Sequence, residues 1–174
     1  MSDVQSINSV HNSIRAEFGK CNVIVNCIST PEISEEFVNN MLTIMQAFIN
    51  DMMQEVGCSI VNVYAKDIDG CGTEAKITNL TKKMAISLAA AQIRVNAIVY
   101  GATATKADHA QYYDENNNPT ELAETLLAKI PMNRLAKPEE ILGALKYLSD
   151  PLAASYTTGS VIYVDGGYTA ANNI

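Results

Sequence analysis

Short apolar runs rich in β-branched residues alternate with longer amphipathic stretches, and this alternation limits the possible folds more than any other feature. The runs predicted as strands are 23–25, 59–64, 93–99 and 161–164. The stretches predicted as helices are 4–18, 31–56, 74–91 and 138–148, and 106–131 is irregular to helical. Strands that alternate with helices form a parallel sheet covered on both faces. The sequence therefore predicts one α/β domain over residues 1–174, with about four strands.

Composition limits the classes of function. The chain has 174 residues, of which 48% are apolar, so it can bury one sizeable core. Charged residues make up 18%, which is low enough to leave room for a buried interface. A net charge of -7 argues against a nucleic-acid partner, because such proteins concentrate Lys and Arg. No apolar run is long enough to span a bilayer and the N-terminus is polar, so we expect a cytoplasmic protein with no membrane partner.

The cysteines and histidines do not form a metal-binding pattern. The sequence has four cysteines, Cys21, Cys27, Cys58 and Cys71. None belongs to a CxxC pair and both histidines lie far from them, so no zinc spacing is present. Cys27 and Cys58 lie in or beside apolar runs and are expected to be buried thiols, as in a reducing cytosol. His11 and His109 are expected at the surface rather than in catalysis.

Several segments resemble, in the right order, those of classical short-chain dehydrogenase/reductases. Residues 93–98 read I-R-V-N-A-I, like a strand of that family. Further matches are 131–134 with its P-x-x-R, 137–141 with its P-E-E-I helix start, 147–150 with its F-L-x-S segment and 155–167 with its terminal T-G and V-D-G-G. Upstream, 17–26 and 59–63 resemble the family's e-F-G…V-N-N and S-I-V-N-I segments. The resemblance implies a Rossmann-like, doubly wound parallel sheet and, in complete members, NAD(P)-dependent oxidoreduction.

The family's cofactor-binding elements are poorly represented. A complete member opens with strand, turn and helix carrying T-G-x-x-x-G-x-G, where the backbone approaches the pyrophosphate. This sequence lacks that motif, and Asp3-Val4 resembles the end of the family's third strand. We therefore expect a truncated sheet without the N-terminal βαβαβ unit of about 60 residues. Residues 26–29 keep one asparagine of N-N-A-G, and Gly101 and Thr105 keep part of P-G-x-x-x-T. These departures predict no cofactor site in this chain.

The positions that align with the family's catalytic residues hold other residue types. The family uses a serine and a Y-x-x-x-K pair, in which the lysine lowers the pKa of the tyrosine that exchanges a proton with the substrate. Counting back from 93 without gaps, the lysine position falls on Glu74, the tyrosine position on Gly70 and the serine position on Ala65. A carboxylate at the lysine position would raise a neighbouring tyrosine pKa. The sequence thus predicts no catalytic, cofactor-binding or metal-ligating residue.

The stretch 31–56 is rich in methionine. Its large apolar side chains include Met41, Met45, Phe48, Met52 and Met53. These exceed what one sheet-facing stripe needs, and Met-rich faces make adaptable contact surfaces. The resemblance implies that this helix and the next pack against another subunit, with a purely intrachain core as the alternative. The strand at 23–25, left at the sheet edge, would add unpaired backbone groups.

These observations favour a non-catalytic pseudoenzyme, not an enzyme by itself. It would assemble with an active paralogue of the same family, as a heterotetramer whose partner carries NAD(P), and stabilise or shape that partner. Family analogy suggests a dehydrogenase of a CoA-thioester intermediate in anaerobic aromatic degradation. One alternative is a non-redox lyase or cyclase using Tyr64, Asp67 or Glu74 as acid or base, although Tyr64 is more simply a packing aromatic. Another alternative is a fragment of a longer oxidoreductase.

Overall fold

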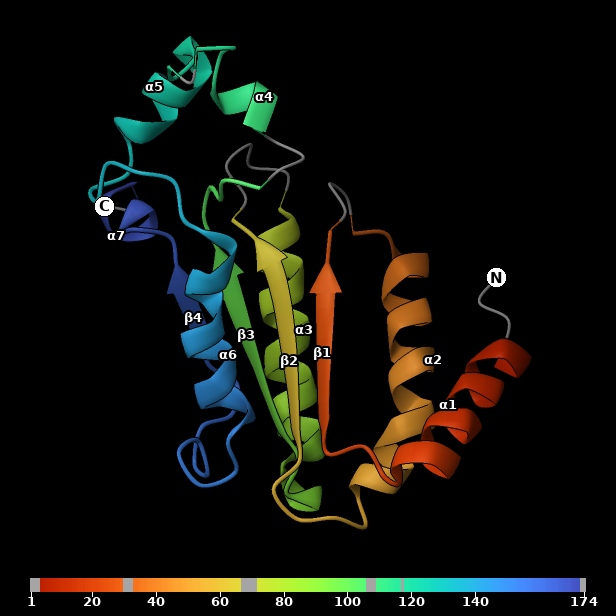
Figure 1. Cartoon of the computed structure of the whole chain (residues 1–174). Helices are drawn as coiled ribbons and strands as arrows, with labels where there is room; N and C mark the ends of the chain where they lie inside the picture. The colour runs from red at the N-terminus through yellow and green to blue at the C-terminus, as the bar shows by residue number, and fades with distance from the viewer. Residues whose placement is uncertain (1–3, 30–32, 67–71, 106–108, 117, 173–174) are drawn as a thin grey trace.

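A parallel sheet forms the centre of the protein. The computed structural model describes residues 4–29, 33–66, 72–105, 109–116 and 118–172. Within them the sheet has four parallel strands, in the spatial order β1-β2-β3-β4 (Figure 1). The strands are β1 (Val23–Ile28), β2 (Ser59–Ala65), β3 (Arg94–Tyr100) and β4 (Val161–Val164). The predicted α/β class, the parallel sheet and the strand number are confirmed.

Helices lie on both sides of the sheet. They are α1 (Val4–Phe18), α2 (Glu35–Met52), α3 (Thr73–Leu88), α4 (His109–Tyr112), α5 (Glu121–Leu127), α6 (Leu142–Ser149) and α7 (Tyr168–Asn172), with short 3-10 turns at Ala89–Ala91 and Pro138–Ile141. Helices α2 and α3 lie on one face and α6 on the other, while α1 packs outside α2 (Figure 1). None of the described helices combines the length and apolarity that a membrane crossing needs.

Local sequence signals explain where the helices begin. The Ser34 side chain accepts a hydrogen bond from the Phe37 N–H and so caps α2, and Thr120 caps α5 through the N–H of Ala123. Pro138 opens the segment that continues into α6, where its missing N–H costs nothing. The predicted helical segment 138–148 is therefore confirmed, as a 3-10 turn followed by α6.

Polar side chains buried in the central strands fix the register of the sheet. The Asn62 amide donates to Thr81 Oγ1 at 2.9 Å, which ties β2 to α3. The Asn96 amide donates to the Thr157 carbonyl at 2.8 Å, and its oxygen accepts from the Ser160 N–H at 3.0 Å. Both asparagines are fully buried, so a shift in register would leave their polar groups without partners.

The edge strand β1 is only half buried. Its predicted place at the sheet edge is confirmed, since it pairs with β2 alone among the described strands. Val23, Val25 and Cys27 are exposed, however, so the expectation of a buried strand and a buried Cys27 thiol is wrong. The reason is that α6 covers β2 and β3 on that face and leaves β1 open. Cys58 is buried as predicted.

Most of the methionine-rich face belongs to the core of the chain. Met41, Met45 and Met52 are buried between α2 and the sheet, so their interpretation as a subunit contact surface is wrong and the intrachain alternative is confirmed for them. Phe48 packs edge-to-face on the His11 ring, with 5.0 Å between centroids. The stripe is wide because α2 has two neighbours, the sheet and α1.

A partly buried charge cluster connects α1 to α2. The His11 side chain is 14% exposed, which contradicts its predicted surface position. Its Nε2 lies 3.0 Å from Asp51 Oδ2, and Arg15 Nη1 lies 2.8 Å from Asp51 Oδ1. Because Asp51 is buried, these contacts satisfy a carboxylate that burial alone would destabilise. The prediction for His109 concerns a side chain outside the described part of the structure.

Met45 lies within α2 and Met53 directly follows it. Because the two side chains differ in burial, we expect their substitution to have unequal effects on stability. Met45→Ala should lower the free energy of unfolding by about 2–5 kcal/mol, because it leaves a cavity in the core. Met53→Ala should change it by no more than about 0.5 kcal/mol, because Met53 is 56% exposed. Urea unfolding followed by circular dichroism measures both. Equal destabilisation by the two substitutions would contradict this assignment of the core.

Candidate active site

The carboxyl ends of the strands converge at one edge of the sheet. Ala65 at the end of β2 is in register with Tyr100 at the end of β3, and Tyr100 is in register with Val164 on β4. In open α/β sheets, ligands bind outside the carboxyl ends of the strands. The side chains that follow these three ends are therefore the first candidates for a functional site.

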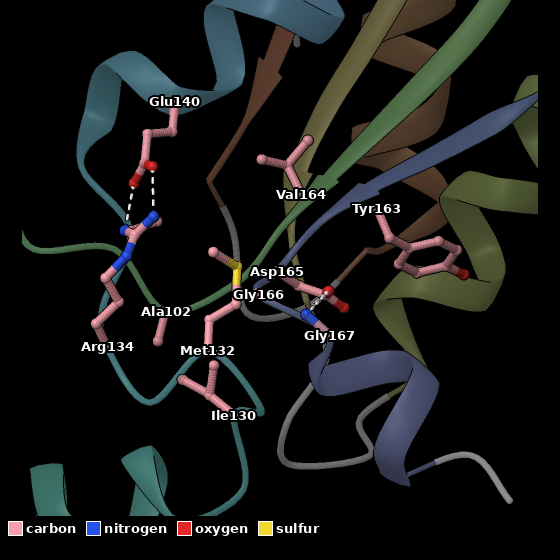
Figure 2. Close-up of a pocket in the computed structure, with 11 residues that line it drawn as sticks. Ala102, Ile130, Met132, Arg134, Glu140, Tyr163, Val164, Asp165, Gly166 and Gly167 are labelled. Carbon is pink, nitrogen blue, oxygen red and sulfur yellow. Dashed lines mark hydrogen bonds and ion pairs between the residues drawn. The ribbon is translucent and has the colours of Figure 1, made fainter.

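A cavity of about 340 Å³, with apolar walls and charged groups at its rim and floor, opens at this edge (Figure 2). It is lined by Ala102, Ile130, Met132, Arg134, Ala136, Glu140, Tyr163, Val164, Asp165, Gly166 and Gly167. The size is within the range of small-molecule sites, and so is the mixture of apolar walls with a few polar groups. The lining comes from the end of β4, the residue after Gly101 and the segment between α5 and α6.

Close backbone contact shapes the floor of this cavity. A Cβ at Gly101 would lie 2.8 Å from the Asp165 Cα, so only glycine lets the end of β3 meet the end of β4 this closely. The Asp165 carboxylate accepts hydrogen bonds from the N–H groups of Gly167, at 3.0 Å, and Thr169, at 2.9 Å. Burial acts to raise the pKa of Asp165, but these bonds prevail and lower it. The retained Gly101 of the sequence motif is thus a structural requirement of this edge.

The rim of the cavity carries a closed ion pair. Arg134 donates to both oxygens of Glu140 at 2.7 Å, and Figure 2 shows the pair on the side away from Tyr163. The hydrogen bonds from Arg134 and from the Lys137 N–H lower the pKa of Glu140 to about 2. Because Glu140 already occupies both ends of the guanidinium fork, Arg134 is not a ready anion-binding group.

A second hollow, of about 430 Å³, lies on the α3 side of the same edge. It is lined by Lys66, Gly72, Glu74, Ala75, Thr78, Asn79 and Tyr163. Lys66 Nζ lies 2.9 Å from Glu74 Oε2, and the Tyr163 hydroxyl donates to Glu74 Oε1 at 2.9 Å. Lys66 Nζ is also 5.8 Å from the centroid of the Tyr163 ring. Three elements, the end of β2, the first turn of α3 and β4, thus bring these side chains together.

The three groups differ in exposure. The Lys66 and Glu74 side chains are 9% and 15% exposed, whereas Tyr163 is 41% exposed. Burial, together with the hydrogen bond to Glu74 and its negative charge, raises the pKa of Tyr163 to about 12. The phenol therefore keeps its proton at neutral pH and donates it in the hydrogen bond to Glu74.

The positions that align with the family's catalytic residues lie in different environments in the structure. Glu74 belongs to the polar cluster just described, and Ala65 is exposed at the end of β2. Gly70 and Asp67 lie outside the described residues. Tyr64 is fully buried and its hydroxyl pairs with Thr78 Oγ1 at 2.8 Å, which confirms it as a packing aromatic.

Sequence reasoning missed two members of the cluster, Lys66 and Tyr163. Lys66 lies two residues after the predicted strand 59–64, and Tyr163 lies near the end of the predicted strand 161–164. Parallel strands place such residues at a common edge. The sequence thus contains a signal for both residues, namely their position at the ends of strands, but neither occupies a serine, tyrosine or lysine position of the family pattern. Among the described residues, no group of three His, Cys, Asp or Glu could hold a metal ion. The predicted lack of a metal site remains a prediction.

Comparison with known proteins identifies the family. Residues 38–169 match the family model described as enoyl-(acyl carrier protein) reductase, one of the models of short-chain dehydrogenases. This match covers the sheet from α2 onward and both hollows at its edge. The chain belongs to the short-chain dehydrogenase/reductase family.

Its relatives are oxidoreductases. An uncharacterized oxidoreductase of Haemophilus influenzae is 27% identical over 99% of this chain and 74% of its own length. A 3alpha-hydroxysteroid dehydrogenase of Mediterraneibacter gnavus is 29% identical over 95% of this chain and 72% of its own. A solved structure described as a D-mannonate oxidoreductase from Haemophilus influenza, with bound NAD, has a TM-score of 0.82 at 26% identity and covers 99% of this chain and 75% of that one. This chain spans about three quarters of their length.

These relatives overturn two expectations drawn from the sequence. The prediction of a non-catalytic pseudoenzyme subunit, not an enzyme by itself, is wrong, because the named relatives are dehydrogenases and oxidoreductases. The suggested role beside a dehydrogenase of CoA-thioester intermediates falls with it, and the relatives lend no support to a non-redox lyase or cyclase. The error came from judging activity by three aligned positions alone.

Two glycine substitutions test the close packing at this edge. Gly101→Ala should lower the free energy of unfolding by about 1–3 kcal/mol, because the new methyl group meets the Asp165 backbone. Gly143→Ala, in α6 with no heavy atom within 4 Å of its new Cβ, should instead raise it by about 0.5–1 kcal/mol. Urea unfolding measures both changes. A neutral Gly101→Ala would show that β3 and β4 do not meet as closely as described.

Proposed function

We propose that this chain is an oxidoreductase that interconverts an alcohol and a carbonyl compound with a nicotinamide cofactor. The observation that carries the proposal is the edge where β2, β3 and β4 end: an apolar cavity adjoins a cluster of proton-carrying side chains there, and Tyr163 lines both. Membership of the short-chain dehydrogenase/reductase family and the NAD bound to one relative support it.

The residues at this edge fit the nicotinamide end of such a cofactor. Lys66 offers an ammonium, which is a suitable donor to a ribose hydroxyl, and Ala102 and Val164 offer an apolar wall for a flat ring. The single phenol proton of Tyr163 is already donated to Glu74. No described helix follows the T-G-x-x-x-G-x-G turn that binds the pyrophosphate in complete members of the family. The predicted lack of a cofactor site in this chain therefore remains a prediction for the pyrophosphate part. When bound, the nicotinamide supplies or accepts the hydride.

The apolar cavity favours a substrate without negative charge. Ile130, Met132 and Val164 form its walls, and Arg134 is engaged by Glu140 at both ends of its guanidinium group. A substrate carboxylate would have to break that pair to gain a charged partner. We therefore propose a ketone or alcohol with an apolar body, closer in kind to a hydroxysteroid than to a sugar acid.

Association with a second short-chain dehydrogenase/reductase subunit also remains a proposal. Exposed Ile44 and Met53 on or beside α2 and Ile86 on α3 support it, because large apolar side chains at a surface favour an interface. A heterotetramer and a cytoplasmic location are likewise predictions from the sequence.

Cofactor-dependent reduction tests the proposed function. The purified protein is given NADH or NADPH with a 3-ketosteroid, cyclohexanone or a keto sugar acid, and loss of absorbance at the reduced nicotinamide band is followed. We expect turnover of an apolar ketone, with kcat/KM about tenfold or more above that for the keto acid, since an unpaired charge in the cavity costs at least about 1.4 kcal/mol. No turnover of any ketone with either cofactor would overturn the proposal.

A further inference from the structure

Charged side chains lie at the rim and at the floor of the cavity where β4 ends. Arg134 and Glu140 pair at its rim, as Figure 2 shows, and Asp165 lies at its floor. Arg134 is the only cationic side chain among the eleven described residues that line this cavity. The charge that a bound molecule meets is therefore decided by how these three groups are paired.

Both carboxylates of this cavity are ionised at neutral pH. The pKa of Asp165 is lowered, although burial acts to raise it, by hydrogen bonds from Thr169 and Gly167. The hydrogen bond from Arg134 is the largest of the contributions that lower the pKa of Glu140 to about 2. The cavity thus holds two negative charges against one positive charge. A substrate carboxylate would add a third negative charge, and the single cation already has a partner.

We propose that Glu140 is a specificity-determining residue: by occupying the guanidinium fork of Arg134, it makes the cavity select uncharged ketones and alcohols over carboxylates. This inference rests on the proposed function and names the residue that sets the charge of the substrate at that site. Removal of this one negative charge, with the fold kept, should turn Arg134 into a carboxylate-binding group.

The backbone holds Glu140 in place as well as Arg134 does. Glu140 Oε2 accepts from the Lys137 N–H at 2.7 Å, as the glutamate of a capping box does at the start of the turn Pro138–Ile141. Arg134 adds a bond from Nη1 to Oε2 and one from Nη2 to Oε1, both at 2.7 Å. Because the backbone bond keeps Glu140 beside Arg134, a substrate carboxylate competes with a partner that is always present.

Arg134 has a second contact that does not involve Glu140. Its Nη1 donates to the Leu135 carbonyl at 3.2 Å, and Leu135 is buried. The guanidinium group should therefore stay at the rim when residue 140 loses its charge. A guanidinium group binds a carboxylate through two parallel N–H donors, so the released Arg134 suits a carboxylate carried on an apolar body.

A single substitution tests this assignment by activity. Glu140→Gln removes the charge and keeps the cap, since glutamine also serves in a capping box. We expect the kcat/KM for 4-oxocyclohexanecarboxylate, relative to that for its uncharged carboxamide, to rise about three- to tenfold. The gain is modest because the Arg134 and Glu140 side chains are 47% and 37% exposed. It should lie in KM rather than in kcat, because the charge stabilises bound substrate and transition state alike.

Glu139→Gln is the matched control for this substitution. Glu139 is exposed on the same turn and does not line the cavity. The control therefore removes the same charge from the same element without releasing Arg134. We expect it to leave the ratio of the two kcat/KM values unchanged.

A second readout needs neither cofactor nor turnover. Met132 lines the same cavity, so its methyl resonance, identified by its absence from Met132→Leu, reports the binding of cyclohexanecarboxylate and of cyclohexanecarboxamide. Glu140→Gln should raise the affinity for the carboxylate relative to the carboxamide by the same three- to tenfold, or about. Sodium chloride at about 0.5 M should reduce this gain, because salt screens a partly exposed charge pair.

Two further variants show whether the gain comes from Arg134. Glu140→Gln combined with Arg134→Gln should lose the gain, because the cavity then has no cation. Arg134→Gln alone should bind the carboxylate more weakly than the unaltered chain does, because Glu140 is left as an unpaired negative charge. Urea unfolding checks that each variant is folded, and Arg134→Gln keeps the test decisive if Glu140→Gln does not fold.

The outcomes separate this inference from the proposed function. If the unaltered chain reduces no ketone, the proposed function fails, and the methyl titration decides whether Glu140 sets the charge preference of the cavity. An unchanged ratio of carboxylate to carboxamide in Glu140→Gln, or no carboxylate binding by it, would overturn the inference while the proposed function stands. A gain that persists without Arg134, or an equal gain in Glu139→Gln, would also overturn it, because net charge rather than the released guanidinium would then be the cause.

Discussion

The placement of β4 beside β3 depends on one buried amide. Asn96 has no exposed surface, and its two polar atoms bond to the backbone of Thr157 and Ser160, just before β4 begins. A buried amide without partners costs about 1–3 kcal/mol, so this contact selects a single register. That register brings Tyr163 to the carboxyl edge, where Glu74 and Lys66 meet it. The arrangement of this edge therefore depends on an asparagine that lines neither of the two hollows.

Much of the fold follows from the sequence pattern. Four β-branched runs and the amphipathic stretches between them predict the parallel sheet and its main helices. This works because the spacing of apolar residues and the length of a segment can be read from that segment alone. The incorrect predictions concern which elements pack against a given segment. Cys27 is exposed because α6 does not reach β1, and Met45 is buried because α2 lies between the sheet and α1. Neither fact can be derived from the segment in which the residue lies.

The candidate site could be predicted only in part, for the same reason. Glu74 and Gly101 were singled out from their sequence positions, and both lie at the functional edge. Lys66 and Tyr163 were missed because they are 97 residues apart in the chain and meet only through the strand order β2-β3-β4. A hydrogen-bonded cluster assembled across a sheet has no local spacing, so no motif along the sequence marks it.

The most direct test of this account is a crystal structure of the protein with nicotinamide cofactor and a bound alcohol or ketone. The account predicts the substrate in the cavity walled by Ile130, Met132 and Val164, with the nicotinamide ring against Ala102 and the Arg134–Glu140 pair unbroken. A substrate bound away from this cavity, or one whose carboxylate breaks the Arg134–Glu140 pair, would contradict the central claim.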